Sequence, residues 1–337
     1  MRLNPHTVTT YFAKFICDDY SLHMRLFSLI LIFCFTPTAY GLDEIDLQNA
    51  SANNNFPKNY IPAKSIRENA SRVYLKLRSR AAVVFDERDN EIIMERNPQQ
   101  VLPVASLSKL MTGMVILDAN LDMNEVIKIS KADKDRLRYS RSRLKQGMKF
   151  KRKDLLLIAL AASENRAASA LARTYPGGKT EFVKAMNQKA KKLGLTKTKF
   201  ADPAGLNNAN VSTAKELMKI VQAAGTYPKI REFTTLTKES IIEQKRGRKI
   251  KFINTNRLVS RKSWPIRLSK TGFTSDAGNC LVMQTKISDR PVIIVLLESW
   301  GKLSKYGDSN RIKKWLMKTE RLVKKEKAKN KINVSSR

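Results

Sequence analysis

The sequence predicts a mixed α/β fold of the α+β type, in which an antiparallel sheet is flanked by helices and carries a helical subdomain. Strand-like apolar runs occur near both ends of the folded region, at 80–97 and at 266–300. Helical patterns fill most of the chain between them. The last three runs follow one another at hairpin spacing, which favours antiparallel pairing within one sheet.

The first 75 residues are predicted to lie outside this fold. Residues 24–41 have the pattern of a secretory signal peptide: a basic residue, a ten-residue apolar run interrupted by one serine, and small residues before a cleavage site after Gly41. That run is too short to span a bilayer, which needs about 20 residues. Residues 1–23 are interpreted as an upstream extension ahead of a true start at Met24, and 42–75 as a flexible linker. We therefore expect export to the periplasm.

The first elements of the folded region, residues 76–323, are a pair of strands and two helices. Residues 80–97 form two strand-like runs around a polar turn at 86–90. Apolar residues spaced at i, i+3, i+7 and i+10 then predict a helix. These residues are Leu107, Leu110, Met114 and Leu117. The apolar stretch 154–162 predicts a helix that is buried on all sides.

Two further helices and the closing strands complete the domain. The stretch "NRAASALARTYPGG" predicts a helix that ends before Pro176, and "STAKELMKIVQAAG" predicts a helix with Ser212 as its N-cap. After the three closing strands, an amphipathic helix covers 312–323. The remaining residues, 324–337, are predicted to form a basic tail.

The residue inventory excludes several mechanisms. Both histidines lie before residue 42, and so do two of the three cysteines. The exported chain would therefore contain no histidine and only Cys280, which excludes a Ser-His-Asp triad, a Cys-His pair and a zinc site built from histidine and cysteine. An enzyme with this inventory must use Lys, Tyr, Asp or Glu as its base.

The net charge of +34 suggests an anionic partner, so a non-catalytic polyanion-binding protein is one interpretation of the chain. Nucleic acid is disfavoured because the chain is predicted to be exported. In addition, aromatic residues make up only 7% and do not interleave with the basic runs, as stacking platforms require. Anionic wall polymer or membrane lipid is the partner that the basic tail favours, and a solvated tail is the alternative.

Four serines precede a lysine by three residues, so this spacing is a weak signal in a lysine-rich chain. The pairs are Ser106/Lys109, Ser142/Lys145, Ser212/Lys215 and Ser299/Lys302. Only the first pair lies among apolar residues at helical period, which places both side chains on one face, roughly 5–6 Å apart. A lysine base must be neutral, and burial lowers its pKa from about 10.4. These residues fit either a nucleophile with its base or the buried face of a helix.

Two more short motifs could carry chemistry. Ser163 and Asn165 lie in a turn between two predicted helices, where a hydroxyl and a carboxamide can face one cleft. A turn held by local hydrogen bonds is the alternative. The run Lys270-Thr271-Gly272 lies in a predicted strand, where the lysine can attract a carboxylate and the glycine lets another backbone come close. An exposed lysine before a turn glycine is the alternative.

Taken in order, Ser-x-x-Lys, Ser-x-Asn and Lys-Thr-Gly form the motif set of penicillin-binding proteins and β-lactamases. The stretches "PVASLSKLMTGMVILD", "DPAGLNNANVSTAKEL" and "SKTGFTSDAGNCLVMQ" extend the match. Residues 76–305 thus resemble the low-molecular-weight penicillin-binding proteins of peptidase family S11. The resemblance implies a β-lactamase/transpeptidase-like fold over 76–323 and a serine DD-peptidase acting on peptidoglycan, with no metal or cofactor.

The resemblance leaves two substrates open. Little chain follows residue 305, so the extra C-terminal domain of the carboxypeptidase branch has no room. This favours the D-alanyl-D-alanine endopeptidase branch, which cleaves D-Ala–meso-diaminopimelate cross-links. A carboxypeptidase that trims stem pentapeptides is the alternative.

The resemblance also assigns the catalytic roles. It implies that Ser106 attacks the D-Ala carbonyl of a stem peptide and becomes acylated, while Lys109 takes its proton. Ser163 and Lys270 would pass protons to the leaving amine and hold the carboxylate of the leaving residue. β-Lactam antibiotics would acylate Ser106 as covalent inhibitors.

The remaining roles concern substrate binding. The resemblance implies that Asn165 hydrogen-bonds the substrate amide and that Thr271 and Gly272 belong to the substrate-binding strand. The backbone N–H groups of Ser106 and Phe273 would form the oxyanion hole.

Overall fold

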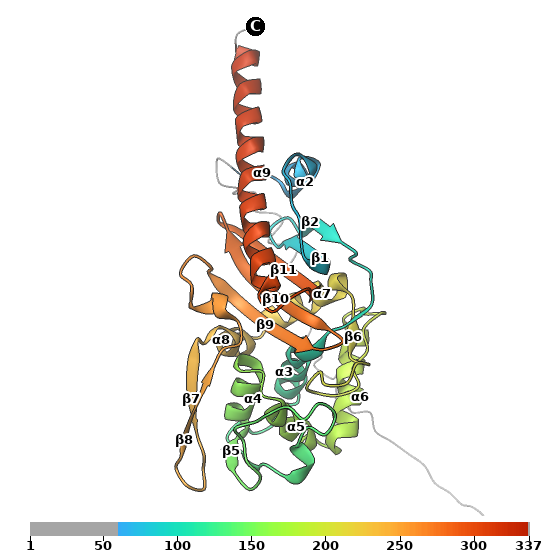
Figure 1. Ribbon diagram of the computed structural model, residues 1–337, viewed down its shortest axis with the longest axis vertical. Coiled ribbons are helices and arrows are strands. Elements are labelled where there is room, and N and C mark those ends of the chain that lie inside the picture. The colour runs from blue at the N-terminus through green and yellow to red at the C-terminus, as the bar shows by residue number, and fades with distance from the viewer. Residues whose placement is uncertain (1–59, 336–337) are drawn as a thin grey trace, which may run out of the picture. The chain divides into compact units, whose positions relative to one another are not determined.

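The computed structural model describes residues 60–335. The predicted extension, the signal peptide and most of the predicted linker lie outside these residues. The described body is built on a five-stranded antiparallel sheet with the strand order β2-β1-β11-β10-β9 (Figure 1). The strands are β1 (Ser79–Asp86), β2 (Glu91–Arg96), β9 (Ile266–Thr274), β10 (Gly278–Ile287) and β11 (Arg290–Ser299). The predicted antiparallel sheet, formed from both ends of the folded region, is confirmed.

Both faces of the sheet are covered, which explains why its central strands are nearly continuous apolar runs. The inner face packs against the helical part of the domain, with α7 (Ala214–Gly225) against β1, β10 and β11. The outer face packs against α2 (Ala63–Glu68) and α9 (Ser304–Ser335). Buried outer-face residues such as Leu281 and Leu296 belong to the same apolar cluster as Trp315 of α9.

The helical part lies on the inner side of the sheet (Figure 1). Its helices are α3 (Lys109–Asp118), α4 (Arg152–Ala161), α5 (Asn165–Arg173), α6 (Gly178–Lys192), α7 and α8 (Pro228–Thr235). Helix α3 runs through its centre and contacts α4, α5, α6, α7 and α8. Three of the four residues whose spacing predicts this helix are fully buried, and Leu117 is partly buried. The predicted helical subdomain is confirmed.

Short elements connect these layers. The small strand pairs are β3 (Leu102–Pro103) with β6 (Val211–Ser212), β4 (Val126–Lys128) with β5 (Lys149–Lys151), and β7 (Lys238–Ile242) with β8 (Lys249–Ile253). The 3-10 turns are η1 (Ala70–Arg72), η2 (Ala105–Ser108), η3 (Lys131–Asp133) and η4 (Arg257–Ser260). None of the helices within residues 60–335 is long and apolar enough to cross a membrane.

Residues 60–75, which fall in the predicted flexible linker, pack onto the domain. Helix α2 lies against β2 and α9, and Ile66 is fully buried there. The buried Arg290 guanidinium donates to the Ile61 carbonyl, and the Trp315 indole donates to the Ala70 carbonyl at 3.2 Å. The prediction fails here because this polar stretch holds few apolar residues, and they are buried by β2 and by elements more than 200 residues away, such as α9.

Two helix ends also differ from the prediction. The N-cap of α7 is Thr213, whose hydroxyl accepts from the Glu216 backbone N–H at 3.1 Å. The Ser212 hydroxyl instead shares a hydrogen bond with Thr198 at 2.7 Å. The amphipathic helix predicted over 312–323 is part of the longer α9, which includes most of the predicted basic tail.

Candidate active site

The predicted nucleophile, Ser106, lies in the turn η2 between β3 and α3. The residue before it, Ala105, has a φ of +47°, a conformation that is strained for alanine. Two glycines make room for this turn. A Cβ at Gly205 would lie 1.9 Å from the Ala105 carbonyl oxygen, and one at Gly272 would lie 3.1 Å from the Ser106 nitrogen. The surrounding backbone therefore fixes the strained turn that presents Ser106.

Lys109 begins α3, one helical turn after Ser106, and its ammonium is fully surrounded. The Nζ donates to Ser106 Oγ at 2.8 Å, to Asn165 Oδ1 at 2.7 Å and to the Ala204 carbonyl at 2.5 Å. Burial lowers the pKa of Lys109 to about 7, against the opposing effect of nearby carboxylates, of which Asp202 is the strongest. Near neutral pH a large fraction of Lys109 is thus uncharged and able to accept a proton.

Ser163 and Asn165 lie where α4 ends and α5 begins, as their position between two predicted helices suggests. Ser163 has a φ of +60°, so this short connection is also strained. The Asn165 carboxamide links two groups: its Oδ1 accepts from Lys109, and its Nδ2 donates to Ser140 Oγ at 2.9 Å. Asn165 therefore orients the lysine from the helical side of the cleft.

Lys270, Thr271 and Gly272 lie on β9, the edge strand that faces the nucleophile turn. Lys270 is only 1% exposed, and its Nζ donates to the Thr271 carbonyl at 3.2 Å. Burial, together with the positive charges of Lys109 and Lys305, holds the pKa of Lys270 well below its usual value. A bound carboxylate would relieve this repulsion, so the position suits an anionic group of a substrate.

Gly272 brings β9 against the nucleophile turn. A Cβ there would lie 3.0 Å from the Val104 carbonyl oxygen and 3.1 Å from the Ala105 Cβ. This close approach places the backbone of the next residue, Phe273, beside Ser106, while the Phe273 side chain is 65% exposed. The expectation that Gly272 permits a close backbone contact is thus met in the structure.

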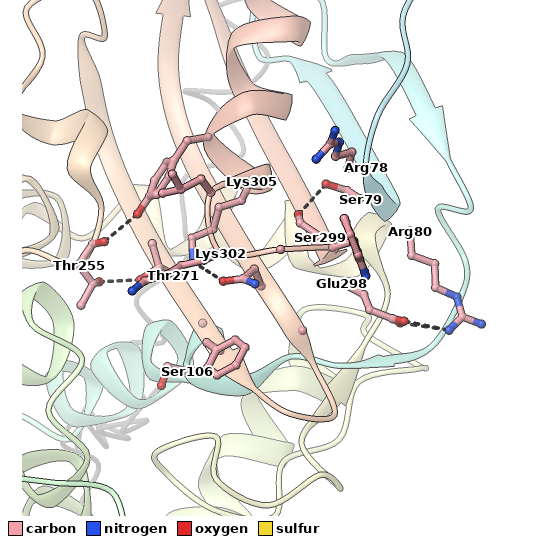
Figure 2. Close-up of a pocket in the computed structure, with 18 of the residues that line it drawn as sticks. Arg78, Ser79, Arg80, Ser106, Thr255, Thr271, Glu298, Ser299, Lys302 and Lys305 are labelled. Atoms are coloured by element: carbon pink, nitrogen blue, oxygen red, sulfur yellow. Dashed lines mark hydrogen bonds and ion pairs between the residues drawn. The ribbon is translucent and has the colours of Figure 1, made fainter.

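These side chains meet in one cleft of about 1210 Å³, whose walls are drawn in Figure 2. Of the predicted site residues, those that line it are Ser106, Ser163, Asn165, Thr271, Gly272 and Phe273. Lys109 and Lys270 lie behind this surface, fully buried. A serine, a lysine of lowered pKa and a second buried lysine at one cleft can carry out acyl transfer.

Comparison with known proteins identifies the family. The model of the peptidase S11 family, described as D-alanyl-D-alanine carboxypeptidase, matches residues 66–300. The chain belongs to this family. It is a serine DD-peptidase that acts on peptidoglycan.

The chain is similar in sequence to named DD-peptidases and in fold to solved structures. A D-alanyl-D-alanine endopeptidase of Pseudomonas aeruginosa is 43% identical over 72% of this chain and 78% of its own length, and one of Escherichia coli is 42% identical over the same shares. Among solved structures, the Streptomyces K15 DD-transpeptidase is 26% identical with a TM-score of 0.67, covering 72% of this chain and 98% of that one. Penicillin-binding protein D2 of Listeria monocytogenes, in a cefotaxime-bound form, is 30% identical with a TM-score of 0.62, covering 73% and 98%.

The other three serine–lysine pairs of this DD-peptidase have structural partners. Ser142 Oγ accepts from the Leu144 backbone N–H at 3.0 Å, and Ser299 Oγ lies 2.7 Å from Ser79 Oγ in the sheet. Ser212 is bonded to Thr198, as described above. Ser108, next to Lys109, donates to the Ala105 carbonyl at 3.0 Å and so supports the strained turn.

Cys280 takes no part in the site. It is fully buried, and burial raises the pKa of its thiol to about 11. A thiol that stays protonated and has no access to solvent is a poor nucleophile.

Three groups at the site were not predicted from the sequence: Ser140, the Ala204 carbonyl and Arg138. The Ala204 carbonyl is positioned by Asp202, whose Oδ1 accepts from the backbone N–H groups of Ala204 and Gly205 at 2.7 and 2.8 Å. The Asp-Pro-x-Gly run that forms this turn is the signal that could have indicated it.

Arg138 connects the loop above the site to the far side of the cleft. Its guanidinium donates to the Leu206 carbonyl at 2.7 Å, to Ser275 Oγ at 3.1 Å and to Asp276 at 2.6 Å, and it also bonds Asn208. The same loop carries Ser140, which accepts from Asn165. Arg138 thus fixes the loop that, through Ser140 and Asn165, orients Lys109. Its sequence context is a run of arginines, which gives no signal for this role.

Proposed function

We propose that this DD-peptidase is an endopeptidase that cleaves D-Ala–meso-diaminopimelate cross-links through an acyl-enzyme on Ser106. The observation that carries the proposal is the 2.8 Å contact between Ser106 Oγ and the buried, low-pKa Lys109 Nζ. The preference for cross-links is supported by the relatives at 43% and 42% identity, whose names are D-alanyl-D-alanine endopeptidase.

Acylation would begin with neutral Lys109 taking the hydroxyl proton of Ser106 as its oxygen attacks the D-Ala carbonyl. The backbone N–H groups of Ser106 and Phe273 would donate to the resulting oxyanion, which the close packing of β9 against the turn supports. Collapse of this intermediate breaks the amide bond. The leaving amine would receive its proton through Ser163 and Lys270.

Substrate binding would use the same strand. The carboxylate of the leaving residue would lie near Lys270 and Thr271, where the buried lysine has no carboxylate partner within residues 60–335. The strand from Thr271 to Phe273 would hold the donor peptide, and Asn165 would contact its amide while orienting Lys109. Water would then attack the ester, releasing the donor peptide and restoring Ser106.

The nucleophile is tested with Ser106→Ala. This variant is expected to lose covalent labelling by a fluorescent penicillin while its circular dichroism spectrum is unchanged. Ser142→Ala, from another serine–lysine pair, is the matched control and should label fully. Full labelling of Ser106→Ala would refute the mechanism.

The substrate is tested with cross-linked muropeptide dimers and pentapeptide monomers, analysed by chromatography. Release of monomers from dimers is expected. Loss of only the terminal D-Ala from pentapeptides would instead identify a carboxypeptidase, an activity that appears in the name of a Bacillus subtilis relative at 32% identity.

We also propose export to the periplasm and binding of the basic end of α9 to anionic wall polymer. The basic end is the part of α9 after residue 323. Its one acidic residue, Glu326, is paired with Arg72, and Glu320 just before it is paired with Arg290. Lys324 and Lys325 are exposed and have no ion pair among the described residues. Replacing the lysines at 324, 325, 327 and 329 by glutamine should reduce co-sedimentation with isolated sacculi. Unchanged co-sedimentation with sacculi would refute the proposal. A variant that loses binding to anionic lipid vesicles but keeps binding to sacculi would refute it too.

A further inference from the structure

The cleft continues beyond the catalytic residues into a second arm, which runs from the centre of Figure 2, at Lys302, to its right side, at Arg78 and Ser79. This arm is formed by the start of β1, the end of β11 and the connection to α9. We call it the basic arm and define it by Arg78, Ser79, Arg80, Ser299, Trp300 and Lys302. None of these residues has a role in the chemistry described above.

Strand register gives the distance from the catalytic strand to the basic arm. Phe273 of β9 pairs with Asn279, Asn279 pairs with Ser299, and Ser299 pairs with Ser79. Three strand spacings of about 4.8 Å make this row roughly 14 Å long. An extended peptide rises about 3.4 Å per residue, so the row matches about four residues.

The floor of the arm is polar, although the sheet beyond it is apolar on both faces. Asn279 and Ser299 are buried, and Lys305 Nζ donates to Asn279 Oδ1 at 3.3 Å. Asn279 of β10 pairs with Phe273 on one side and with Ser299 on the other, so the Lys305 ammonium lies between the catalytic strand and the arm. A continuous polar path therefore leads from Lys270 to Ser79.

The walls of the arm are fixed in place. Buried Asp308 accepts from the backbone N–H groups of Arg78 at 3.0 Å and Ser79 at 2.7 Å, which holds the start of β1. At the end of β11, Glu298 has a φ of +47° where the register with β10 shifts. A bulge of this kind changes the direction in which the neighbouring side chains point. Trp300, two residues further on, is 78% exposed.

The charge of the arm is not balanced by the protein. The carboxylates in the cleft wall are both paired, Glu298 with Arg80 at 3.1 Å and Asp276 with Arg138 at 2.6 Å. Arg78 and Lys302 are exposed, and within residues 60–335 neither has a carboxylate at ion-pair distance. The arm therefore suits an anionic ligand that enters from the catalytic end.

We propose that the basic arm binds the carboxylates of the second stem peptide of a cross-linked dimer, with Arg78 and Lys302 as the binding cations. The inference rests on the proposed function, in which the leaving residue lies beside Lys270. In a cross-linked dimer that residue continues into a peptide with free carboxylates, whereas a pentapeptide monomer releases only one D-Ala. The arm thus gives the enzyme a preference for cross-linked substrates.

Binding to a chain that cannot turn over tests the arm directly. In full-length Ser106→Ala, the affinity for a cross-linked tetrapeptide dimer and for a tetrapeptide monomer is measured by calorimetry, with and without Arg78→Gln and Lys302→Gln together. Two exposed charge contacts predict a loss of about fivefold to tenfold for the dimer and less than twofold for the monomer. Added salt should weaken dimer binding in the parent more than in the variant.

The matched control is Arg261→Gln with Lys262→Gln, an exposed arginine–lysine pair outside the cleft. It should leave dimer affinity unchanged. Equal dimer affinity in parent and arm variant would overturn the inference, as would equal losses for dimer and monomer. The arm variant with Ser106 intact should keep its rate of penicillin acylation. Absence of penicillin labelling in the parent would refute the proposed function, while the binding comparison would still decide the role of the arm.

Discussion

The pKa of Lys109 can be shifted by replacing the side-chain amide of its partner Asn165 with a carboxylate. In Asn165→Asp, a carboxylate oxygen would replace the amide oxygen that lies 2.7 Å from Lys109 Nζ. An opposite charge at this distance stabilises the charged form of a group and shifts its pKa by about 1–3 units. The pKa of Lys109 would then rise from about 7 to between about 8 and 10.

The rate consequence follows from the fraction of neutral lysine. Acylation requires neutral Lys109, so the rate rises with pH and levels off above the pKa. Raising the pKa by about 1–3 units lowers the neutral fraction at pH 7 by roughly 5-fold to 500-fold. The assay is the rate of acylation by a fluorescent penicillin from pH 5 to 10.

The parent should show a midpoint near pH 7, and Asn165→Asp a midpoint above pH 8 with substantial recovery of rate at high pH. Asn310→Asp, at an exposed asparagine of α9, is the control and should keep the parent profile. A uniformly reduced rate with an unchanged midpoint would refute the reasoning, because it would show that Asn165 does not set the charge of Lys109.

Three further outcomes are expected. Gly272→Ala should lower the penicillin acylation rate by about 100-fold, because the added Cβ would press β9 away from the turn that presents Ser106. An unchanged rate would mean that a displacement of β9 does not disturb Ser106. Arg138→Gln should lower the penicillin acylation rate more than Arg136→Gln, a change at an exposed neighbour. It should also move the midpoint of the pH profile of acylation, since the loop that carries Arg138 orients Asn165 through Ser140. A loss of stability with no change in that midpoint would contradict this role. Ile66→Ala should cost about 2–4 kcal/mol of unfolding free energy in urea, because Ile66 is fully buried; no change would indicate that α2 is not part of the cooperative unit.

The sequence by itself restricted the chemistry of this protein and, through the order of its three motifs, indicated its family. The lack of histidine after residue 23 restricts the choice of base. The spacing of Ser106 and Lys109 brings their side chains together even though Ser106 lies in the 3-10 turn η2 and Lys109 begins α3, because i and i+3 positions are neighbours in both kinds of helix. Apolar periodicity and hairpin spacing determined the antiparallel sheet and the buried central helix for the same reason, since these patterns depend on local geometry.

Tertiary structure decided which of four similar serine–lysine pairs can act. Lys109 acquires its lowered pKa from burial and its position from Asn165 and Ala204, which lie 56 and 95 residues away. The packing of residues 60–75 was decided in the same way, because Ile66 is buried by β2 and α9, which lie outside its own segment. The burial of a side chain and the pKa of a charged group depend on all the residues that the fold brings near them. The spacing of residues along the sequence does not show which residues these are.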